Sequence, residues 1–270
     1  MSGIDVNGSV VMITGGQGGI GVALAEAFVA AGATVVSTDL AGRRADMELN
    51  VTDASATASV MRRIVDEHGR LDIVIANAGI GVAGVVDDID AAAWQRTIDV
   101  NIRGTVNTVC AALPILHAGG GGSIVLIASL AGLAGTPLLT PYAMSKSAVV
   151  GLGASLRPEA ARHGVGVTVV CPGPVETPLL DETAATPGVS VRRYLTAAAG
   201  KPIAAAALAD AVVAGVRRDS ALVVPGRAAM LWRINRLFPR IVRRVSAAGM
   251  RKELRAAAGD HRDRPINATH

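Results

Sequence analysis

Tyr142 and Lys146 lie four residues apart in the segment YAMSK, and Ser129 precedes Tyr142 by thirteen residues. Side chains at this spacing share one helix face, so the ammonium of Lys146 should stand one turn from the phenol of Tyr142. A phenol has an ordinary pKa of about 10 and is a poor base near neutral pH, but a neighbouring cation should lower that pKa. The segment is therefore typical of a site that exchanges a proton with a substrate oxygen, which the hydroxyl of Ser129 could hold.

A second candidate site is the glycine-rich segment TGGQGGIG at residues 14–21. It follows a Val-rich run and precedes a pattern of helical composition. Gly15, Gly19 and Gly21 let the backbone turn sharply and approach a pyrophosphate, and the start of a helix offers unpaired N–H groups to anionic oxygens. The segment predicts a dinucleotide-binding loop; the alternative is a glycine-rich turn without a ligand.

An acidic residue, Asp39, ends the next apolar run, 24 residues after the first glycine of the predicted loop. A carboxylate there can accept hydrogen bonds from the adenosine ribose hydroxyls and would repel a 2′-phosphate. Arg43 and Arg44 follow closely and could in principle reach such a phosphate. Gln17 and Gly18, however, place no cation in the loop itself. The pattern favours NAD as the cofactor, with NADP as the less favoured alternative.

Apolar runs rich in Val and Ile alternate along the chain with Ala-rich helical patterns. Because the runs do not switch between polar and apolar residues, they predict a doubly wound, parallel α/β sheet of about seven strands with helices on both faces, a Rossmann fold. A chain of 270 residues is long enough for one such domain. The predicted strands are 9–14, 33–39, 71–77, 123–129, 165–171 and 221–224, and the predicted helices are about 19–31, 53–68, 91–117, 141–163 and 203–217.

Basic charge is concentrated near the end of the chain. Residues 225–270 hold eleven Lys and Arg against three Asp and Glu, a net of +8, so the total of +4 leaves residues 1–224 with −4. We predict that 1–224 is a dinucleotide-binding catalytic domain and that 225–270 is a basic, amphipathic helical extension with a disordered end at 260–270. Pro239 should kink or split the helix.

Two partners are consistent with the predicted extension. It could pack on its own or a neighbouring subunit, or it could lie on an anionic membrane surface through 227–245. No recognised motif or row of stacking aromatic residues favours a nucleic acid. The chain also lacks a basic start followed by a long apolar segment, which predicts a soluble, cytoplasmic protein. Cys110 and Cys171 stand alone, so we expect two buried structural thiols and no metal site.

Together these motifs resemble the short-chain dehydrogenase/reductase family. TGGQGGIG fits the family's TGxxxGxG, ANAG (76–79) its NNAG, YAMSK its YxxxK and PGPVETP (172–178) its PGxxxT. Asn101 sits in the helix where the family keeps an asparagine, and the resemblance covers about residues 7–224. It implies an NAD(P)-dependent oxidoreductase acting on CH–OH groups, with the catalytic residues Asn101, Ser129, Tyr142 and Lys146.

The resemblance also implies how the cofactor is held. Lys146 would hydrogen-bond the nicotinamide ribose, and Asn101 would hold a water that links Lys146 to solvent as a proton relay. Val175 and Thr177 would meet the nicotinamide carboxamide, and Asn77 would lie near the adenosine ribose. The implied cofactor-binding residues are Gly15, Gln17, Gly19, Ile20, Gly21, Asp39, Asn50, Val51, Asn77, Ala78, Gly79, Tyr142, Lys146, Pro172, Val175 and Thr177.

Two positions depart from the family pattern. Asn50-Val51 stands where the family usually shows Asp-Val, although the amide oxygen of Asn50 can still accept a hydrogen bond from the adenine amino group. Ala76 replaces the first asparagine of NNAG, and Asn77 is kept. Both changes concern the adenosine end of the cofactor, so the resemblance leaves the predicted catalytic residues intact.

On the substrate side, the resemblance implies a mobile lid at about 174–202. It implies homodimers or homotetramers as well. Because no charged anchor lines the implied pocket, a hydrophobic secondary alcohol or its ketone is the favoured substrate. The alternative is a catalytically silent, cofactor-binding regulatory or membrane-surface scaffold protein with the same fold. The implied lid contacts are Leu179, Leu180, Val189 and Tyr194, and the implied pocket positions are Ile80, Leu130, Leu138 and Pro172.

Overall fold

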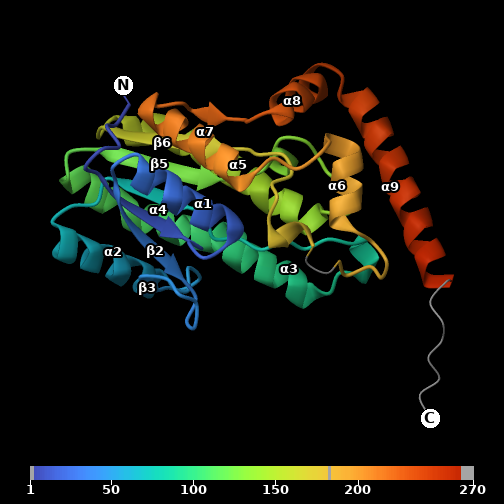
Figure 1. Cartoon of the computed structure of the whole chain (residues 1–270), viewed down its shortest axis with the longest axis horizontal. Coiled ribbons are helices and arrows are strands. Elements are labelled where there is room, and N and C mark those ends of the chain that lie inside the picture. The colour runs from blue at the N-terminus through green and yellow to red at the C-terminus, as the bar shows by residue number, and fades with distance from the viewer. Residues whose placement is uncertain (1–2, 182–183, 263–270) are drawn as a thin grey trace, which may run out of the picture.

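The structure is a computed structural model, and it describes residues 3–181 and 184–262 (Figure 1). Its strands are β1 (Val10–Thr14), β2 (Thr34–Asp39), β3 (Met47–Glu48), β4 (Ile73–Ala76), β5 (Gly122–Ile127), β6 (Val165–Val170) and β7 (Leu222–Val223). In this part of the chain they form one seven-stranded parallel sheet in the order β3-β2-β1-β4-β5-β6-β7, which confirms the predicted doubly wound fold. The order reverses between β1 and β4, where ligands bind beyond the carboxyl ends of the strands in such sheets.

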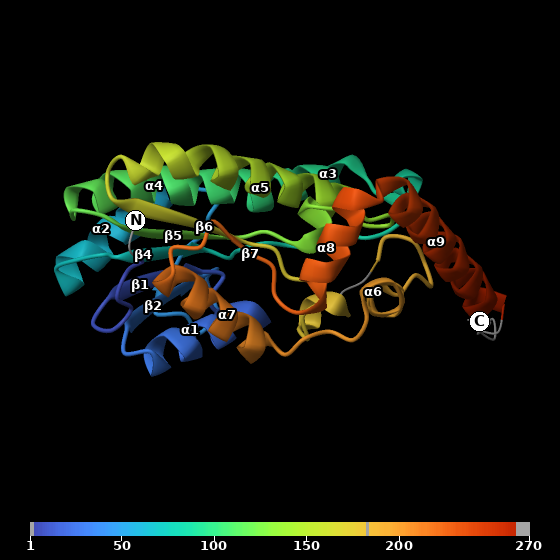
Figure 2. The ribbon, with the colours of Figure 1, turned by 90° about the horizontal axis from the view of Figure 1, so that it is seen from above.

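Helices cover both faces of the sheet (Figure 2). The helices are α1 (Gly19–Ala30), α2 (Ala54–His68), α3 (Ala91–Thr97), α4 (Gly104–Ala118), α5 (Thr140–Ala161), α6 (Val191–Ala199), α7 (Ala205–Arg217), α8 (Arg227–Leu237) and α9 (Pro239–Arg262). In β1, Met12 packs with the core beneath α2, α4 and α5, whereas Ile13 packs with the core beneath α1 and α7. Because successive side chains enter two different cores, the strands carry no polar face.

Most predicted boundaries are correct to within two residues, and the local chemistry explains them. Asp53 caps α2 by accepting a hydrogen bond from the Ala56 N–H at 2.9 Å, and Gly69 ends it with a φ of +75°. The single helix predicted over 91–117 is wrong in one respect, because a π-helical turn at Ile98–Arg103 separates α3 from α4. β3 has only two residues and no apolar run of its own, so no strand was predicted there.

The C-terminal residues form α8 and α9 at one end of the molecule, beside α6 of the predicted lid (Figures 1 and 2). Pro239 starts α9, which confirms that this proline splits the helix. Of the end predicted to be disordered, residues 260–262 continue α9, and residues 263–270 lie outside the described part of the chain. Within the described residues, no helix is both long enough and apolar enough to span a membrane.

Candidate active site

The predicted dinucleotide-binding loop connects β1 to α1. Gly15 has a φ of +63°, and a Cβ atom there would lie 2.8 Å from the Cα atom of Ala78. A Cβ atom at Gly21 would clash with the carbonyl oxygen of Gly15, so glycine is required at both positions. Gly18 precedes α1 and provides no side-chain cap, which leaves the first N–H groups of the helix available to an anion. The loop therefore fits a dinucleotide pyrophosphate.

Asn77 and Thr14 hold this loop against the end of β4. The amide of Asn77 donates hydrogen bonds to the carbonyl oxygens of Thr14 and Gly15, both at 2.9 Å. The hydroxyl of Thr14 accepts from the N–H groups of Asn77 at 3.0 Å and Ala78 at 3.1 Å. The Asn77 amide thus positions the loop backbone, in addition to lying beside the predicted adenosine site.

Asp39 lies at the carboxyl end of β2, next to the loop. Its carboxylate accepts hydrogen bonds from the N–H groups of Gln17 at 2.9 Å and Leu40 at 2.8 Å. The Nε atom of Arg43 lies 3.4 Å from the same carboxylate. The charge of Arg43 is therefore partly compensated by Asp39.

Asn50 and Val51 follow β3 at the same edge of the sheet. The Oδ1 atom of Asn50 already accepts hydrogen bonds from the N–H and hydroxyl of Thr52, at 3.1 and 2.9 Å. An adenine amino group would have to compete with these bonds for the amide oxygen. Val51 is buried against the start of α4, where a Cβ atom at Gly104 would lie 2.5 Å from its Cγ2 atom.

Ser129, Tyr142 and Lys146 are brought together by the end of β5 and the start of α5. The hydroxyl of Ser129 acts on the pKa of the Tyr142 phenol and accepts a hydrogen bond from the N–H of Ala131 at 3.2 Å. Lys146 is only 4% exposed, its Nζ atom lies 5.7 Å from the centroid of the Tyr142 ring, and this atom donates to the carbonyl oxygen of Ile127 at 2.8 Å. The spacing in the sequence therefore does place a phenol, an ammonium and a hydroxyl in one cluster.

The ionisation of this cluster differs from the prediction. Burial raises the pKa of Tyr142 above its ordinary value, and the hydrogen bond with Ser129 offsets only part of that effect. Burial also lowers the pKa of Lys146 to about 8. On balance the pKa of the phenol is therefore raised, because desolvation dominates and the ammonium is directed to the Ile127 carbonyl; that Lys146 favours the phenolate beside a bound oxidised nicotinamide stays a prediction.

Asn101 is fully buried in the π-helical turn between α3 and α4. Its amide accepts a hydrogen bond from the N–H of Ile80 at 2.8 Å and donates to the Ile80 carbonyl and the Ser145 hydroxyl, both at 2.9 Å. A Cβ atom at Gly79 would lie 3.3 Å from both Asn101 Oδ1 and Lys146 Nζ. Because Gly79 has no side chain, the space between Asn101 and Lys146, which the predicted water would connect, stays open.

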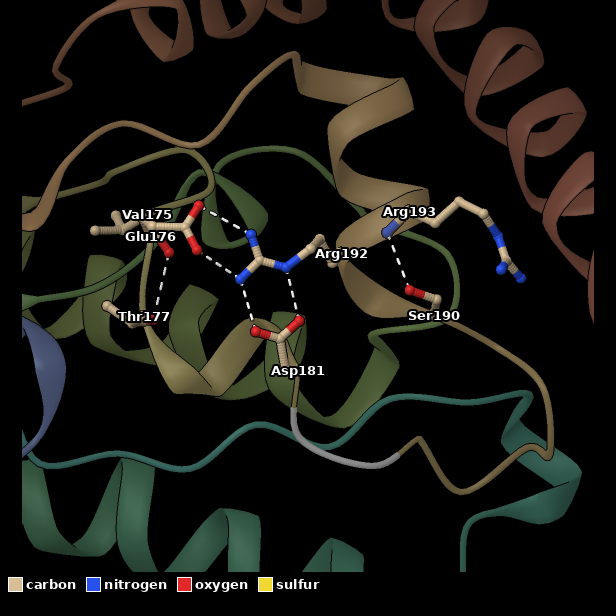
Figure 3. Close-up of polar contacts among 7 residues, drawn as sticks. All are labelled: Val175, Glu176, Thr177, Asp181, Ser190, Arg192 and Arg193. Carbon is tan, nitrogen blue, oxygen red and sulfur yellow. Dashed lines mark hydrogen bonds and ion pairs between the residues drawn. The ribbon is translucent and has the colours of Figure 1, made fainter.

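The segment of the predicted lid passes the glycine loop after β6. A Cβ atom at Gly19 would lie 2.8 Å from the Cγ2 atom of Thr177, and Val175 is buried beside it. Figure 3 shows Arg192 of α6 between two carboxylates: it donates to Glu176 at 2.6 and 2.9 Å and to Asp181 at 2.6 Å. These hydrogen bonds lower the pKa values of both carboxyl groups.

An apolar cavity of about 210 Å³ opens next to Ser129 and Tyr142. Of the predicted contacts, Leu130, Pro172, Leu179, Leu180 and Tyr194 line it. The predicted pocket positions Ile80 and Leu138 and the predicted lid contact Val189 are not among the residues that line it. The backbone of Ile80 is bonded to Asn101, and Leu138 is buried with a φ of +64°.

Sequence reasoning missed one wall of this cavity. The C-terminal extension contributes Leu231, Ile234, Asn235, Val242 and Ser246 to it. The spacing of 231, 234 and 235 on a helix was a usable signal, but it indicates one face without saying what that face contacts.

The expectation of two buried thiols is correct for Cys171 and wrong for Cys110, which is exposed on α4.

Comparisons with known proteins agree with this architecture. The family model for short chain dehydrogenase matches residues 9–188. The 3-oxoacyl-[acyl-carrier-protein] reductase FabG of Thermotoga maritima is 32% identical over 192 residues, covering 66% of this chain and 78% of that protein. The D-beta-hydroxybutyrate dehydrogenase of Rhizobium meliloti is 32% identical over 188 residues, 63% of this chain and 73% of its own length.

Among solved structures, that of levodione reductase is 26% identical and superposes with a TM-score of 0.71. The superposition covers 83% of this chain and 98% of that one. The family match includes the glycine loop, Asn101, Ser129, Tyr142 and Lys146, and it ends before α6. The chain therefore belongs to the short-chain dehydrogenase/reductase family, whose members are oxidoreductases that bind a nicotinamide cofactor and act on CH–OH groups.

Proposed function

We propose that this protein is an NAD-dependent oxidoreductase that interconverts a hydrophobic secondary alcohol and its ketone. The observation that carries the proposal is the cluster of Ser129, Tyr142 and Lys146, of which Ser129 and Tyr142 line an apolar cavity that also reaches Ile20 at the start of α1. Each group has a chemical task there: a hydroxyl holds the substrate oxygen, a phenol exchanges its proton, and an ammonium stabilises the phenolate.

In the oxidation, Ser129 holds the substrate hydroxyl and Tyr142 takes its proton. A bound oxidised nicotinamide supplies the acceptor for the hydrogen that leaves the carbinol carbon with its electron pair, and it adds a positive charge near the phenol. Because burial raises the pKa of Tyr142, the ammonium of Lys146 alone does not produce the phenolate. Tyr142 in its protonated form is suited to the reverse step, in which it donates a proton to the ketone oxygen. Asn101 would hold the water that returns protons to Lys146.

NAD is the proposed cofactor because of the charge at the end of β2. The carboxylate of Asp39 is fixed by the N–H groups of Gln17 and Leu40 at the position expected for the adenosine ribose. A 2′-phosphate placed there would meet this negative charge. Arg43 could pair with such a phosphate only by leaving the carboxylate of Asp39, from which its Nε atom is 3.4 Å away.

A hydrophobic substrate is proposed from the cavity wall. Of the described residues that line the cavity, none carries a charge, and the polar side chains other than Ser129 and Tyr142 are neutral. A carboxylate substrate such as the one named for the hydroxybutyrate dehydrogenase would find no cation there. The relative named for 3-oxoacyl groups acts on a ketone attached to an acyl chain, which is the class that an apolar cavity accommodates.

A panel of secondary alcohols and ketones, read by the absorbance of the reduced cofactor, tests this proposal with NAD and with NADP. We expect turnover of lipophilic members, little turnover of hydroxy acids, and a higher kcat/KM with NAD. Turnover restricted to hydroxy acids would refute the substrate class, and a preference for NADP would refute the role of Asp39.

The alternative is a protein of the same fold that binds the cofactor without turnover, as a regulator or scaffold. The intact set of Asn101, Ser129, Tyr142 and Lys146 argues against it, since cofactor binding alone does not require all four. NADH binding by calorimetry, together with silence across the whole panel, would favour this alternative.

For the quaternary structure we propose a cytoplasmic homodimer or homotetramer, as is typical of the family. Val106 on α4 and Met144 on α5 are each 39% exposed, which is consistent with an apolar contact on these two helices. Light scattering after size exclusion tests this proposal, and a monomeric mass at micromolar concentration would contradict it.

The extension offers a second contact surface. We define its apolar ridge as Met230, Leu237, Phe238 and Ile241, which are 51–71% exposed. Five exposed arginines (Arg233, Arg236, Arg240, Arg243 and Arg244) flank the ridge and pair with no carboxylate among the described residues. An anionic membrane surface would match both the apolar and the cationic groups, whereas a symmetric contact between two such ridges would bring ten arginines together.

Sedimentation with vesicles tests this membrane contact. The protein should bind vesicles rich in phosphatidylserine and should lose that binding when Leu237 and Ile241 are both changed to Asp or when the salt concentration is raised. Binding to neutral vesicles of equal strength, or none to anionic ones, would contradict the proposal and leave packing on the chain itself as the role of the extension.

A further inference from the structure

The cavity extends beyond the part of the chain that the family model matches. Its wall near Ser129 and Tyr142 comes from β5, α5 and the lid, whereas the opposite wall comes from α8 and α9. Leu231, Ile234 and Asn235 of α8 and Val242 and Ser246 of α9 contribute to that wall. The family match ends at residue 188, so these five residues lie outside the matched segment.

Contacts on the catalytic side fix α8 in place. Ala228 is 4% exposed, and a Cβ atom at Gly173 would lie 3.4 Å from its Cβ atom. Gly173 follows Pro172 in the motif that leads from β6 into the lid. The side chain of Asn235 donates a 3.4 Å hydrogen bond to the carbonyl oxygen of Leu133, in the loop between Ser129 and Tyr142. α8 therefore packs on the same loops that present the catalytic groups.

A buried carboxylate joins α9 to the lid. Glu253 is 4% exposed and accepts hydrogen bonds from the N–H of Ser190 at 2.8 Å and from two guanidinium nitrogens of Arg193 at 2.7 and 2.8 Å. Ser190 caps α6, so the negative charge also lies at the N-terminal end of that helix, where it is favourable. Gly188, with a φ of +76°, packs against the backbone of Ala257. Two turns of α9 thus hold the lid.

These contacts decide what the cavity can accept. A substrate with its oxygen between Ser129 and Tyr142 would extend away from the sheet, toward α8 and α9. Three of the five extension residues on the cavity wall belong to α8, which is held by the burial of Ala228 and by the hydrogen bond of Asn235; the other two belong to α9, which is held by Glu253. The far wall is therefore an ordered surface, and its position limits the length of an apolar chain.

We propose that the C-terminal extension is the distal wall of the substrate site and determines the length of the apolar group that the enzyme accepts, with Leu231 and Val242 as the specificity-determining residues. This inference rests on the proposed function, because it takes Ser129 and Tyr142 as the place of the reacting oxygen. It assigns the inner face of the extension to the substrate, and the outer ridge remains free for other contacts.

The test uses secondary 2-alkanols of four to twelve carbons and the Val242→Phe variant of the full chain. The larger side chain should fill the distal end, so the ratio of kcat/KM for long over short alcohols should fall at least about tenfold, while the short alcohols keep their rates. The control is Val245→Phe on the same helix, whose side chain is 65% exposed and outside the cavity; it should leave the ratio unchanged. An unchanged ratio in Val242→Phe would overturn the inference while leaving the proposed function intact.

A second variant covers the case in which the larger side chain prevents folding. Leu231→Ala enlarges the cavity at the same wall and should move the highest kcat/KM to longer alcohols. A highest kcat/KM at an unchanged chain length would overturn the inference. Calorimetric titration with 2-alkanones in the presence of NADH separates this result from a failure of the proposed function. A length limit in binding that shifts with Leu231→Ala supports the distal wall even if no alcohol is turned over.

Discussion

Changing Tyr142 to Phe should lower kcat at least about 100-fold for any alcohol or ketone that the wild-type protein converts. The substitution removes the phenolic hydroxyl that faces the cavity together with Ser129, and it leaves the ring that packs beside Lys146. The other phenol of the cavity wall, Tyr194, belongs to α6, and burial raises its pKa to about 12; the remaining polar side chains there are alcohol hydroxyls and an amide of weak acidity.

NADH binding separates a chemical effect from a structural one. The dissociation constant for NADH should change little in Tyr142→Phe, since the glycine loop, Asp39 and Lys146 are retained. Tyr194→Phe is the matched variant: this second tyrosine is 4% exposed and also lines the cavity, so its change should act mainly on KM. Turnover by Tyr142→Phe close to that of the wild type would remove Tyr142 from the mechanism.

The strands and the pairing of Tyr142 with Lys146 could be predicted because both depend on local sequence. A Val- and Ile-rich run without a polar face indicates a strand buried on both sides, as Met12 and Ile13 illustrate in β1. Tyr142 and Lys146 could be placed together because four residues make one helical turn, whatever the rest of the chain does. The glycine loop is similar, since the positive φ of Gly15 and the crowding at Gly21 are properties of one short segment.

The pKa of Tyr142 and the far wall of the cavity could not be predicted, because both depend on contacts between distant segments. Burial of the phenol results from the packing of α5, the lid and the loop after β5, and its effect on the pKa outweighs that of Ser129. The Asn235 to Leu133 bond and the Ser190 to Glu253 bond join residues 102 and 63 positions apart. An amphipathic pattern predicts that α8 and α9 have an apolar side, but it cannot distinguish a cavity wall from an exposed ridge.

Changing Lys146 to Met should lower kcat by a factor similar to that of Tyr142→Phe, about 100-fold, and should also weaken NADH binding. The ammonium is the cation nearest the phenol, and the resemblance to the family gives it a hydrogen bond to the nicotinamide ribose. For the wild-type protein, kcat/KM should also fall as the pH rises through about 8, because Lys146 loses its charge there. The residual kcat/KM of the variant should not show this fall.

The free energy of unfolding distinguishes this catalytic role from a structural one. A structural lysine would stabilise the fold, whereas a lysine that is buried only for catalysis should destabilise it. The pKa of Lys146 falls from 10.5 to about 8 on folding. Below pH 8 both states carry the charge and the folded state bears the cost of burying it; between about pH 8 and 10.5 the unfolded chain binds more protons, so stability rises with pH.

A pKa shift of this size lowers the free energy of unfolding by about 3 kcal/mol at pH 7. This is more than the roughly 1 kcal/mol that the hydrogen bond of Lys146 to the Ile127 carbonyl contributes. Lys146→Met should therefore be at least as stable as the wild type in urea denaturation at pH 7, and its advantage should shrink as the pH approaches 10.5. A variant that is markedly less stable would show that Lys146 supports the fold, and loss of activity would then not establish a catalytic role. A stable variant with little activity leaves the chemistry as the reason for a buried ammonium at this position.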